Sequence, residues 1–211
     1  MVSRRSAPRP QADETRTRIV DAALQALRSD GIAGVSARAI ARHGGFNQAL
    51  IFYHFGSVEG LLVAVARRES ERRSALYAPA LREVTSLPEL VAVARRLHDE
   101  EFAAGSVAAL TQMLAGAVGS EELARGIWGA LEPWTTLVRE TIGRLLADTP
   151  YGDALPPGDL TAAVTALFLG IELLTGLDPN GRDGTLFPTI EAAAALIDAL
   201  LRSPAPASAE S

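Results

Sequence analysis

The sequence predicts an all-helical protein, and two observations lead to that prediction. Alternating runs of Val, Ile and Thr, which are typical of strands, are absent, and no Asn-Gly turn lies between two such runs. Stretches rich in Ala and Leu recur instead, separated by glycines and prolines. We therefore expect helices joined by loops along the whole chain.

Composition narrows the class of protein further. A chain of 211 residues can form one large domain or two small ones. It has no Cys, which excludes disulfides, thiolate zinc sites and cysteine nucleophiles, and we expect a cytoplasmic protein. The most apolar stretch, residues 160–177, is interrupted by Thr161, Thr165, Glu172 and Thr175, so a buried helix is expected there and not a membrane span.

The net charge of -5 conceals two halves of opposite sign. Residues 1–73 hold twelve Arg against seven acidic residues, whereas residues 74–211 hold eight Arg against eighteen acidic residues. A positive field over the first part would steer it to phosphates, although ordinary surface scatter is the alternative interpretation. The first residues carry arginines and prolines without an apolar run, so we expect a disordered basic arm over 1–12 and no signal peptide.

Helix start and stop signals follow each other closely after this arm. Apolar positions at helical spacing predict a helix over about 14–30, which Gly31 ends. Ser36 can cap a short helix that ends near His43, and Asn47 can cap the next helix, over about 48–54, after a turn at 44–45. Two short helices joined by a tight turn predict a helix-turn-helix over about 36–55. A linker helix is expected from residue 57 to about Pro79.

The segment 39–57, AIARHGGFNQALIFYHFGS, resembles the helix-turn-helix of the TetR family of transcriptional regulators, including its trailing Tyr-His-Phe. The resemblance covers about residues 13–73. It implies a homodimer whose paired recognition helices enter successive major grooves of a palindromic double-stranded operator, and a small-molecule effector that respaces them. Such proteins are usually repressors, although activators and members without a ligand occur.

Within this segment, the resemblance and the chemistry of the side chains give candidate DNA contacts. Gln48 can form paired hydrogen bonds to adenine and is the leading base reader, while a solvated surface amide is the alternative. Tyr53 and His54 match positions that contact phosphates, although either could be packing. The apolar positions Phe46, Leu50, Phe52 and Phe55 are expected in the core. The predicted DNA-binding residues are Ser36, Arg38, Asn47, Gln48, Tyr53 and His54.

Behind a DNA-binding domain over 13–73, we expect an effector-binding and dimerisation domain over 74–202 and a disordered tail over 203–211. Its helices are expected at roughly 88–103, 106–117, 121–130, 133–147, 159–177 and 187–202. The last two have broad apolar faces, which a second copy or an internal core could cover. The predicted dimer-interface residues are Leu167, Phe168, Ile171, Leu174, Ile190, Ala194, Ile197 and Leu201.

An effector cavity in such a domain would be mostly apolar with a few directed polar groups, and would suit a hydrophobic or aromatic molecule. Glu172 is the most suggestive residue, because a carboxylate within an apolar helix needs a partner. Core packing is the alternative for the aromatic residues. The candidate residues are His98, Phe102, Gln112, Met113, Trp128, Trp134 and Glu172.

The sequence offers little to other classes of protein. Its histidines are His43, His54 and His98, and it has no phosphate-binding glycine loop and no paired-His spacing, so we expect no enzyme, no metal site and no cofactor. Residues 178–184 resemble a calcium loop superficially, but their spacing fails. The remaining alternative is a structural or nucleoid-type DNA-binding protein without an effector, which a tightly filled sensor core would favour.

Overall fold

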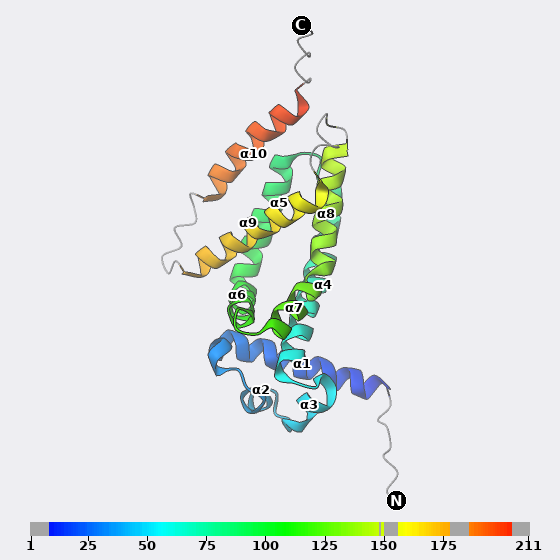
Figure 1. Cartoon of the computed structure of the whole chain (residues 1–211), viewed down its shortest axis with the longest axis vertical. Coiled ribbons are helices and arrows are strands. Elements are labelled where there is room, and N and C mark those ends of the chain that lie inside the picture. The colour runs from blue at the N-terminus through cyan, green and yellow to red at the C-terminus, as the bar shows by residue number, and fades with distance from the viewer. Residues whose placement is uncertain (1–8, 148, 150–155, 178–185, 204–211) are drawn as a thin grey trace, which may run out of the picture. The chain divides into compact units, whose positions relative to one another are not determined.

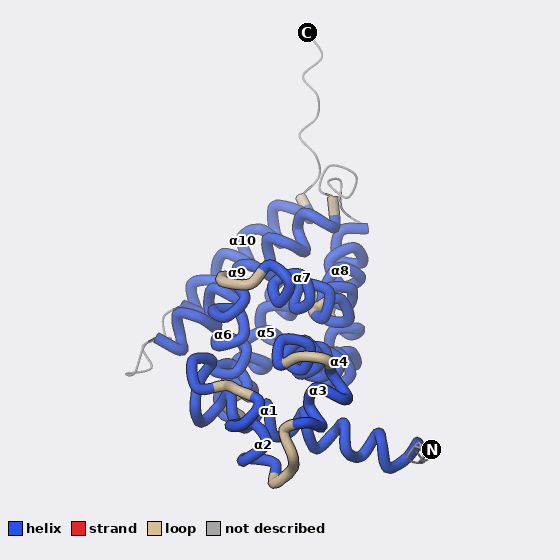
Figure 2. Tube along the Cα trace, turned by 60° about the horizontal axis from the view of Figure 1, so that its bottom comes forward, coloured by secondary structure: helices blue, strands red, loops and turns tan. Residues whose placement is uncertain are grey.

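The computed structural model describes residues 9–147, 149, 156–177 and 186–203, and the regular elements in this part of the chain are all α-helices (Figures 1 and 2). This confirms the predicted fold class. The helices are α1 (Arg9–Gly34), α2 (Ala37–Gly44), α3 (Ala49–Phe55), α4 (Val58–Glu83), α5 (Leu87–Ala103), α6 (Ser106–Ala117), α7 (Glu121–Ala130), α8 (Glu132–Ala147), α9 (Pro157–Leu177) and α10 (Leu186–Arg202).

Two helices extend beyond the ends that the sequence predicted. The expected arm over 1–12 is wrong for residues 9–12, because α1 begins at Arg9 and Pro10 lies in its first turn, where a missing N–H is harmless. Helix α4 continues through Pro79 to Glu83, since one proline removes only one hydrogen bond of a long helix. Residues 1–8, the calcium-like loop and residues 204–211 of the tail lie outside the described residues.

The chain divides into two compact units that do not follow the sequence order. The first is drawn from residues 1–70 and 108–131, and the second from residues 71–107 and 132–211. The first boundary lies near the expected one at residue 73. The segment 108–131, which the sequence assigned to the second domain, groups with the first unit instead.

A contact between residues far apart in sequence shows why the segment 108–131 belongs to the first unit. Gly31 has a φ of 65° and breaks the helical path of α1. The N–H of Ile32, just after the break, donates to Oε1 of Gln112 on α6 at 3.0 Å. Met113 on α6 and Ile127 on α7 are fully buried, like the core residues of α1 to α4. Helices α6 and α7 therefore complete the core of the first unit.

The core of the second unit consists of two apolar clusters. One contains Tyr77, Leu81, Val84 and Leu97, from the end of α4, the loop after it and α5. The other contains Val138, Ile142 and Leu146 of α8. Trp134 packs against both clusters and so joins them. Helix α10 packs on α5, and α9 packs on α8.

Polar side chains fasten the helix ends of this unit. Arg144 on α8 donates to the carbonyl oxygens of Leu81 and Arg82, both at 2.7 Å, and so satisfies the exposed end of α4. Asp198 on α10 accepts a hydrogen bond from the N–H of Leu87, at the start of α5, at 3.0 Å. The relative positions of α4, α5, α8 and α10 are thus set by hydrogen bonds as well as by packing.

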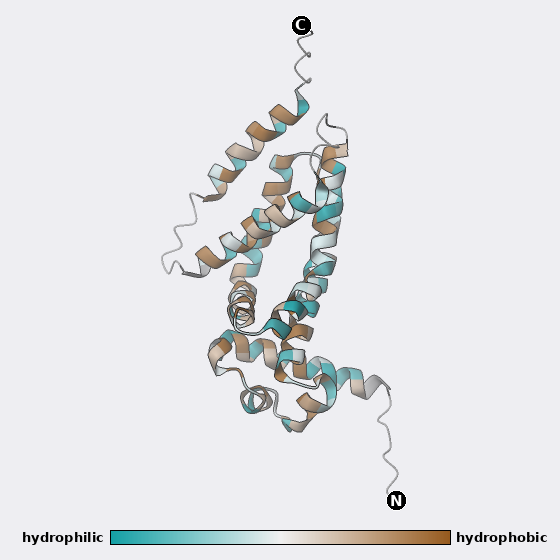
Figure 3. Ribbon diagram, viewed as in Figure 1, coloured by the Kyte–Doolittle hydropathy of each residue, from teal (hydrophilic) through white to brown (hydrophobic). Residues whose placement is uncertain are grey.

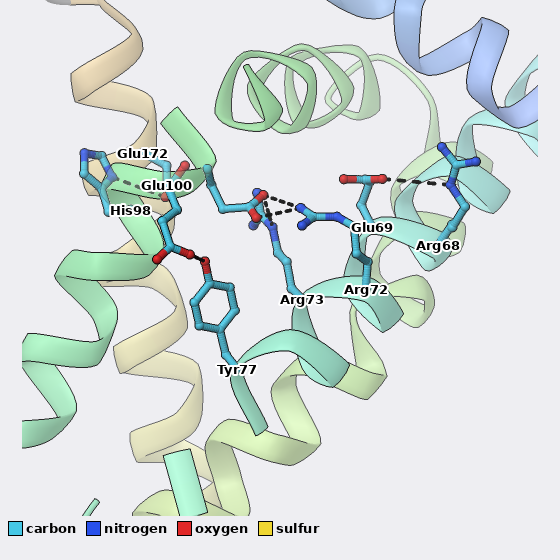
Figure 4. A network of polar contacts seen from close by, with 9 residues as sticks. Arg68, Glu69, Arg72, Arg73, Tyr77, His98, Glu100 and Glu172 are labelled. Carbon is cyan, nitrogen blue, oxygen red and sulfur yellow. Dashed lines mark hydrogen bonds and ion pairs between the residues drawn. The ribbon is translucent and has the colours of Figure 1, made fainter. Parts of the chain in front are cut away.

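A buried ion cluster joins α4 to α5 (Figure 4). Glu101, which is 2% exposed, lies 2.5 Å from an Nη of Arg72 and 3.1 Å from Nε of Arg73. Burial alone would raise the pKa of Glu101, but the hydrogen bond from Arg72 and the charges of Arg73 and Arg72 outweigh it, and its pKa is lowered. Beside it, the Tyr77 hydroxyl donates to Glu100, and burial raises the pKa of that phenol.

One described helix, α9 over Pro157–Thr175, is long and apolar enough to cross a membrane, judged by length and composition alone. Only 22% of that window is buried within the chain. Its buried side carries polar residues, namely Thr161, Thr165, Glu172 and Thr175. Its exposed apolar residues are Leu167, Leu173 and Leu174. Apolar residues, drawn brown, recur along the ribbons of α9 and α10 in Figure 3.

We expect Glu101→Gln to destabilise the protein by about 3 kcal/mol, because it leaves two arginines beside an uncharged amide in a buried place. Because its pKa is lowered, ionised Glu101 stabilises the fold at pH values above its usual pKa of 4.5. This stabilisation is lost as the pH falls through the lowered pKa. The variant should therefore lose less stability than wild type on acidification. Urea denaturation at several pH values measures both effects.

The matched control is Glu191→Gln, which breaks the exposed ion pair with Arg95 in the same unit. It should change the free energy of unfolding by only about 0–1 kcal/mol. Equal losses in the two variants would contradict the role given to the buried cluster.

Candidate nucleic-acid interface

Capping side chains define the two helices of the predicted helix-turn-helix. Ser36 has an extended backbone, and its Oγ accepts a hydrogen bond from the N–H of Ala39 at 3.2 Å, which starts α2. Oδ1 of Asn47 accepts one from the N–H of Ala49 at 2.9 Å, which starts α3 one residue later than expected. Both capping predictions are confirmed. These contacts hold the first turns of α2 and α3 by local chemistry.

The turn between the helices depends on its two glycines. Gly45 has a φ of 63° and closes α2 with its N–H on the carbonyl oxygen of Ala41. Gly44 lies against the ring of Phe46, where a Cβ would come within 2.2 Å of a ring carbon. A side chain at either position would move the ring or strain the backbone, so the angle between α2 and α3 rests on this pair.

An open groove lies along α2 and the start of α3. Its polar lining consists of Arg38, Arg42, Asn47 and Gln48, all exposed. Gln48 makes no capping hydrogen bond, so its amide is not used to start the helix. Two guanidinium groups and two amides on one open surface provide donors and acceptors suited to phosphates and base edges.

The C-terminal end of α3 presents the other predicted contacts. Tyr53 is 80% exposed, and its ring meets the ring of His54 edge-on, with centroids 4.9 Å apart. The carbonyl oxygen of His54 accepts a hydrogen bond from Arg16 at 3.0 Å, and the same guanidinium lies 4.4 Å from the centroid of Phe55. Phe52 is 51% exposed, so its expected place in the core is wrong.

Three arginines of this surface were missed by sequence reasoning. Arg16 and Arg18 of α1 lie over the rings of Phe55 and Phe46, and so support both ends of α3. Their spacing of two residues on the exposed side of α1 was the available signal. Arg42, the third, lines the groove from the last turn of α2, one helical turn after Arg38.

An acidic residue of α1 holds the end of α2. Asp30 lies 2.9 Å from Nε2 of His43 and 3.7 Å from an Nη of Arg42. Hydrogen bonds from His43 and then Ser29 lower the pKa of Asp30. The carboxylate is therefore charged at neutral pH and fixes the last turn of α2 beside the groove.

The residues predicted to surround an effector are divided between the units. Gln112, Met113 and Trp128 belong to the first unit, where Gln112 holds Ile32, Met113 is buried and Trp128 is 70% exposed. None of these three lines either cavity of the second unit. These three candidates thus belong to a different unit from the others.

The remaining candidates lie together in the second unit. His98 Nδ1 lies 3.3 Å from Oε1 of the buried Glu172, and the His98 ring stacks on Phe102 with centroids 6.1 Å apart (Figure 4). Trp134 lines a small cavity of about 60 Å³ that Phe168 and Thr165 also line. A larger cavity of about 280 Å³ lies among apolar residues of α5, α9 and α10.

The predicted dimer-interface residues differ in exposure, although six of the eight line the larger cavity, namely Leu167, Phe168, Ile171, Ile190, Ala194 and Ile197. Ile171 and Ala194 are buried within the chain, and Leu201 packs against the α8 cluster. Leu167, Leu174 and Ile197 are exposed. Other large apolar residues of these helices are also exposed, among them Leu173, Leu196 and Leu200.

Among the described residues, no group of three His, Asp or Glu side chains could hold a metal ion.

Asn47→Ala and Gln48→Ala form a matched pair, because they replace adjacent amides with different uses. Asn47→Ala removes a cap and should lower the free energy of unfolding by about 1 kcal/mol. Gln48→Ala should change it by less than about 0.5 kcal/mol. Urea denaturation of both variants measures this, and equal losses would assign a structural role to Gln48 as well.

Comparison with known proteins agrees with this geometry. The sequence model of the family described as bacterial regulatory proteins, tetR family, matches residues 19–65. The HTH-type transcriptional regulator UidR of Escherichia coli strain K12 is 23% identical over 161 residues, which cover 76% of this chain and 79% of UidR.

Two solved structures share the fold over nearly the whole chain. The fatty acid degradation regulator FadR from Bacillus halodurans has a TM-score of 0.69 at 15% identity, covering 95% of this chain and 100% of FadR. The multidrug binding protein EbrR, solved with imidazole, has a TM-score of 0.62 at 27% identity, covering 98% of this chain and 100% of EbrR. Residues 19–65, which include the helix-turn-helix of α2 and α3, thus match the tetR family of bacterial regulatory proteins, and the chain as a whole has the fold of the regulators that it resembles.

Proposed function

We propose that this protein is a DNA-binding transcriptional regulator, a homodimeric repressor that binds a palindromic operator and is released from it by a small hydrophobic or aromatic effector. The observation that carries the proposal is the open groove of Arg38, Arg42, Asn47 and Gln48 beside a firmly capped α3. Such a surface supports α3 as the helix that enters the major groove.

Each polar side chain of the surface has a role in this proposal. Gln48 reads an adenine through paired hydrogen bonds, because its amide is exposed and unused in the fold. Arg38 reaches base edges or backbone from α2. Tyr53 and His54 contact phosphates from the far end of α3 and set the register. Ser36 and Asn47 contribute mainly by capping, since their side-chain oxygens already accept backbone N–H groups.

The exposed apolar side of α9 and α10 supports the dimer. Leu174, Leu196 and Leu200 are 59%, 64% and 60% exposed, and these helices lie next to each other in sequence in the second unit. Apolar side chains on two long helices favour an isologous interface with the same pair from a second copy. We call the exposed set Leu167, Leu173, Leu174, Leu196, Ile197 and Leu200 the outer face.

The two cavities of the second unit support an effector. The larger one, about 280 Å³, approaches the size of small-molecule sites and is lined by apolar residues. EbrR, which shares the fold, is a multidrug binding protein. A ligand-independent, nucleoid-type DNA-binding protein would have no use for such space in its second unit, and the cavities therefore favour the effector-controlled regulator.

The DNA-binding role predicts a loss of sequence discrimination in Gln48→Ala. The variant should lose about 1–3 kcal/mol of preference for the operator over random DNA, because one bidentate base contact disappears. Fluorescence anisotropy with DNA from upstream of the gene, at two salt concentrations, measures it. Gln25→Ala, an exposed amide of α1 outside the groove, should behave like wild type. Equal binding of wild type to genome-selected fragments and random DNA would overturn the proposal.

If the outer face forms the dimer interface, a charged side chain introduced there should dissociate the dimer. We expect Leu196→Glu to be monomeric in analytical ultracentrifugation at concentrations where wild type is a dimer, because the new carboxylate would be buried without a partner. Leu76→Glu, at a 54% exposed position of α4, should remain dimeric. A dimeric Leu196→Glu protein would place the interface elsewhere.

A further inference from the structure

Two buried side-chain polar atoms of the described residues have no hydrogen-bond partner, and both belong to α9. They are Oγ1 of Thr165 and Oε2 of Glu172. Folded proteins satisfy about nine-tenths or more of such groups, because an unsatisfied one costs about 1–3 kcal/mol. Seven residues are about two helical turns, so the two atoms lie on the same side of α9.

Other threonines of α9 donate hydrogen bonds to backbone carbonyl oxygens of the preceding helical turn. Thr161 donates to the carbonyl oxygen of Pro157 at 2.6 Å, and Thr175 donates to that of Ile171 at 2.9 Å. Thr165 makes no such bond, and it lines the small cavity. The residue with the unsatisfied hydroxyl therefore lies at the wall of a cavity.

Proton counting fixes the charge of the pair formed by His98 and Glu172. The single proton of Thr175 is on Ile171, so its oxygen can only accept, and it lies 3.5 Å from Nε2 of His98. With Nε2 protonated, the contact of Nδ1 with Oε1 of Glu172 at 3.3 Å needs one more proton between the two atoms. Imidazolium with carboxylate and imidazole with carboxylic acid both have zero net charge. In either form, Oε2 of Glu172 is an acceptor without a donor.

This pair continues the walls of the cavities by one helical turn. Ala94 and Phe168 line both cavities, and His98 and Glu172 follow them by four residues on α5 and α9. The His98 ring also lies against Phe187, a wall of the larger cavity, with centroids 5.3 Å apart. Thr165 thus lines the small cavity, and Glu172 lies one helical turn beyond Phe168, which lines both cavities.

We propose that the second unit binds a neutral, largely apolar molecule whose hydrogen-bond donor, such as a hydroxyl group, is accepted by Oε2 of Glu172. This inference rests on the proposed function, for which it names the chemical class of the effector. The apolar lining holds the body of the molecule, and Oε2 holds its polar end.

The charges around the pair favour a neutral ligand over an ionic one. The larger cavity is lined by apolar side chains, which would strip the water from any ion. Glu172 already faces His98, and the buried acid on α5, Glu101, already holds Arg72 and Arg73. An ammonium group would lose its water among apolar walls, and a carboxylate would meet the acceptor Oε2.

Three probes with the same alkyl chain test the proposal: octanol, octylammonium and octanoate. Binding is followed by the fluorescence of Trp134, which lines the small cavity, in full-length protein carrying Trp128→Phe. We expect saturable binding of octanol, at least about tenfold tighter than that of either ion. Tighter binding of either ion, or no saturable binding of octanol, overturns the proposal.

Variants locate the binding. Glu172→Leu should weaken octanol binding about five- to tenfold through loss of the acceptor, whereas Glu140→Leu, at an exposed position of α8, should not. Ala94 lines both cavities, so the larger side chain of Ala94→Phe should occupy cavity space, leave Glu172 unchanged and abolish binding. Circular dichroism checks that each variant is folded. Wild-type affinity in folded Glu172→Leu or Ala94→Phe protein overturns the proposal.

The failures of the two proposals are distinguishable, because octanol binding is measured without DNA. Protein that discriminates the operator but does not bind octanol contradicts only the ligand class. Protein that binds octanol but releases no operator on binding it contradicts the effector role of the site, while the site itself stands.

Discussion

The ion cluster of Glu101 with Arg72 and Arg73 is the constraint on which the second unit depends most. Dispersion contacts between apolar helices tolerate small shifts of one helix against the other. A buried carboxylate between two guanidinium groups tolerates few such shifts, because a displaced partner leaves a charge without compensation. The cluster therefore fixes the register of α5 against α4. Since α5 carries Ala94 and His98, the position of this helix also determines where the cavities and the pair of His98 and Glu172 lie. The hydrogen bond from Leu87 to Asp198 then sets α10 against the same helix.

Helix α9 shows how one apolar segment can serve two surfaces. Its buried side carries threonines and a glutamate, and its outer side carries leucines that the chain leaves exposed. A helix optimised for stability alone would have the reverse distribution. Unsatisfied atoms at Thr165 and Glu172 lower stability, and natural proteins retain such features mainly at functional sites. The distribution along α9 thus agrees with a ligand inside and a second copy outside.

Local chemistry explains what the sequence could predict. Ser36, Asn47 and Gly45 act on atoms within a few residues of themselves, so the caps and the turn could be inferred from neighbouring residues alone. The contact between Gln112 and Ile32 joins residues 80 positions apart, and no local pattern indicates it, so the grouping of 108–131 with the first unit could not be predicted from the sequence. Helix α9 buries threonines and a glutamate and exposes leucines, so the usual rule that apolar residues point inward could not separate its inward from its outward residues. The buried Ile171 was therefore grouped with the exposed Leu174.

The interleaved first unit has a consequence for how the chain folds during synthesis. Helices α1 to α4 leave the ribosome first, but Met113, Ile127 and the Gln112 contact come from residues made much later. At about 5–20 residues per second, the first 70 residues wait several seconds for the segment that completes their core. During that interval the nascent chain exposes apolar surface next to its arginines. The first unit therefore cannot complete its core until the chain has been made as far as residue 131.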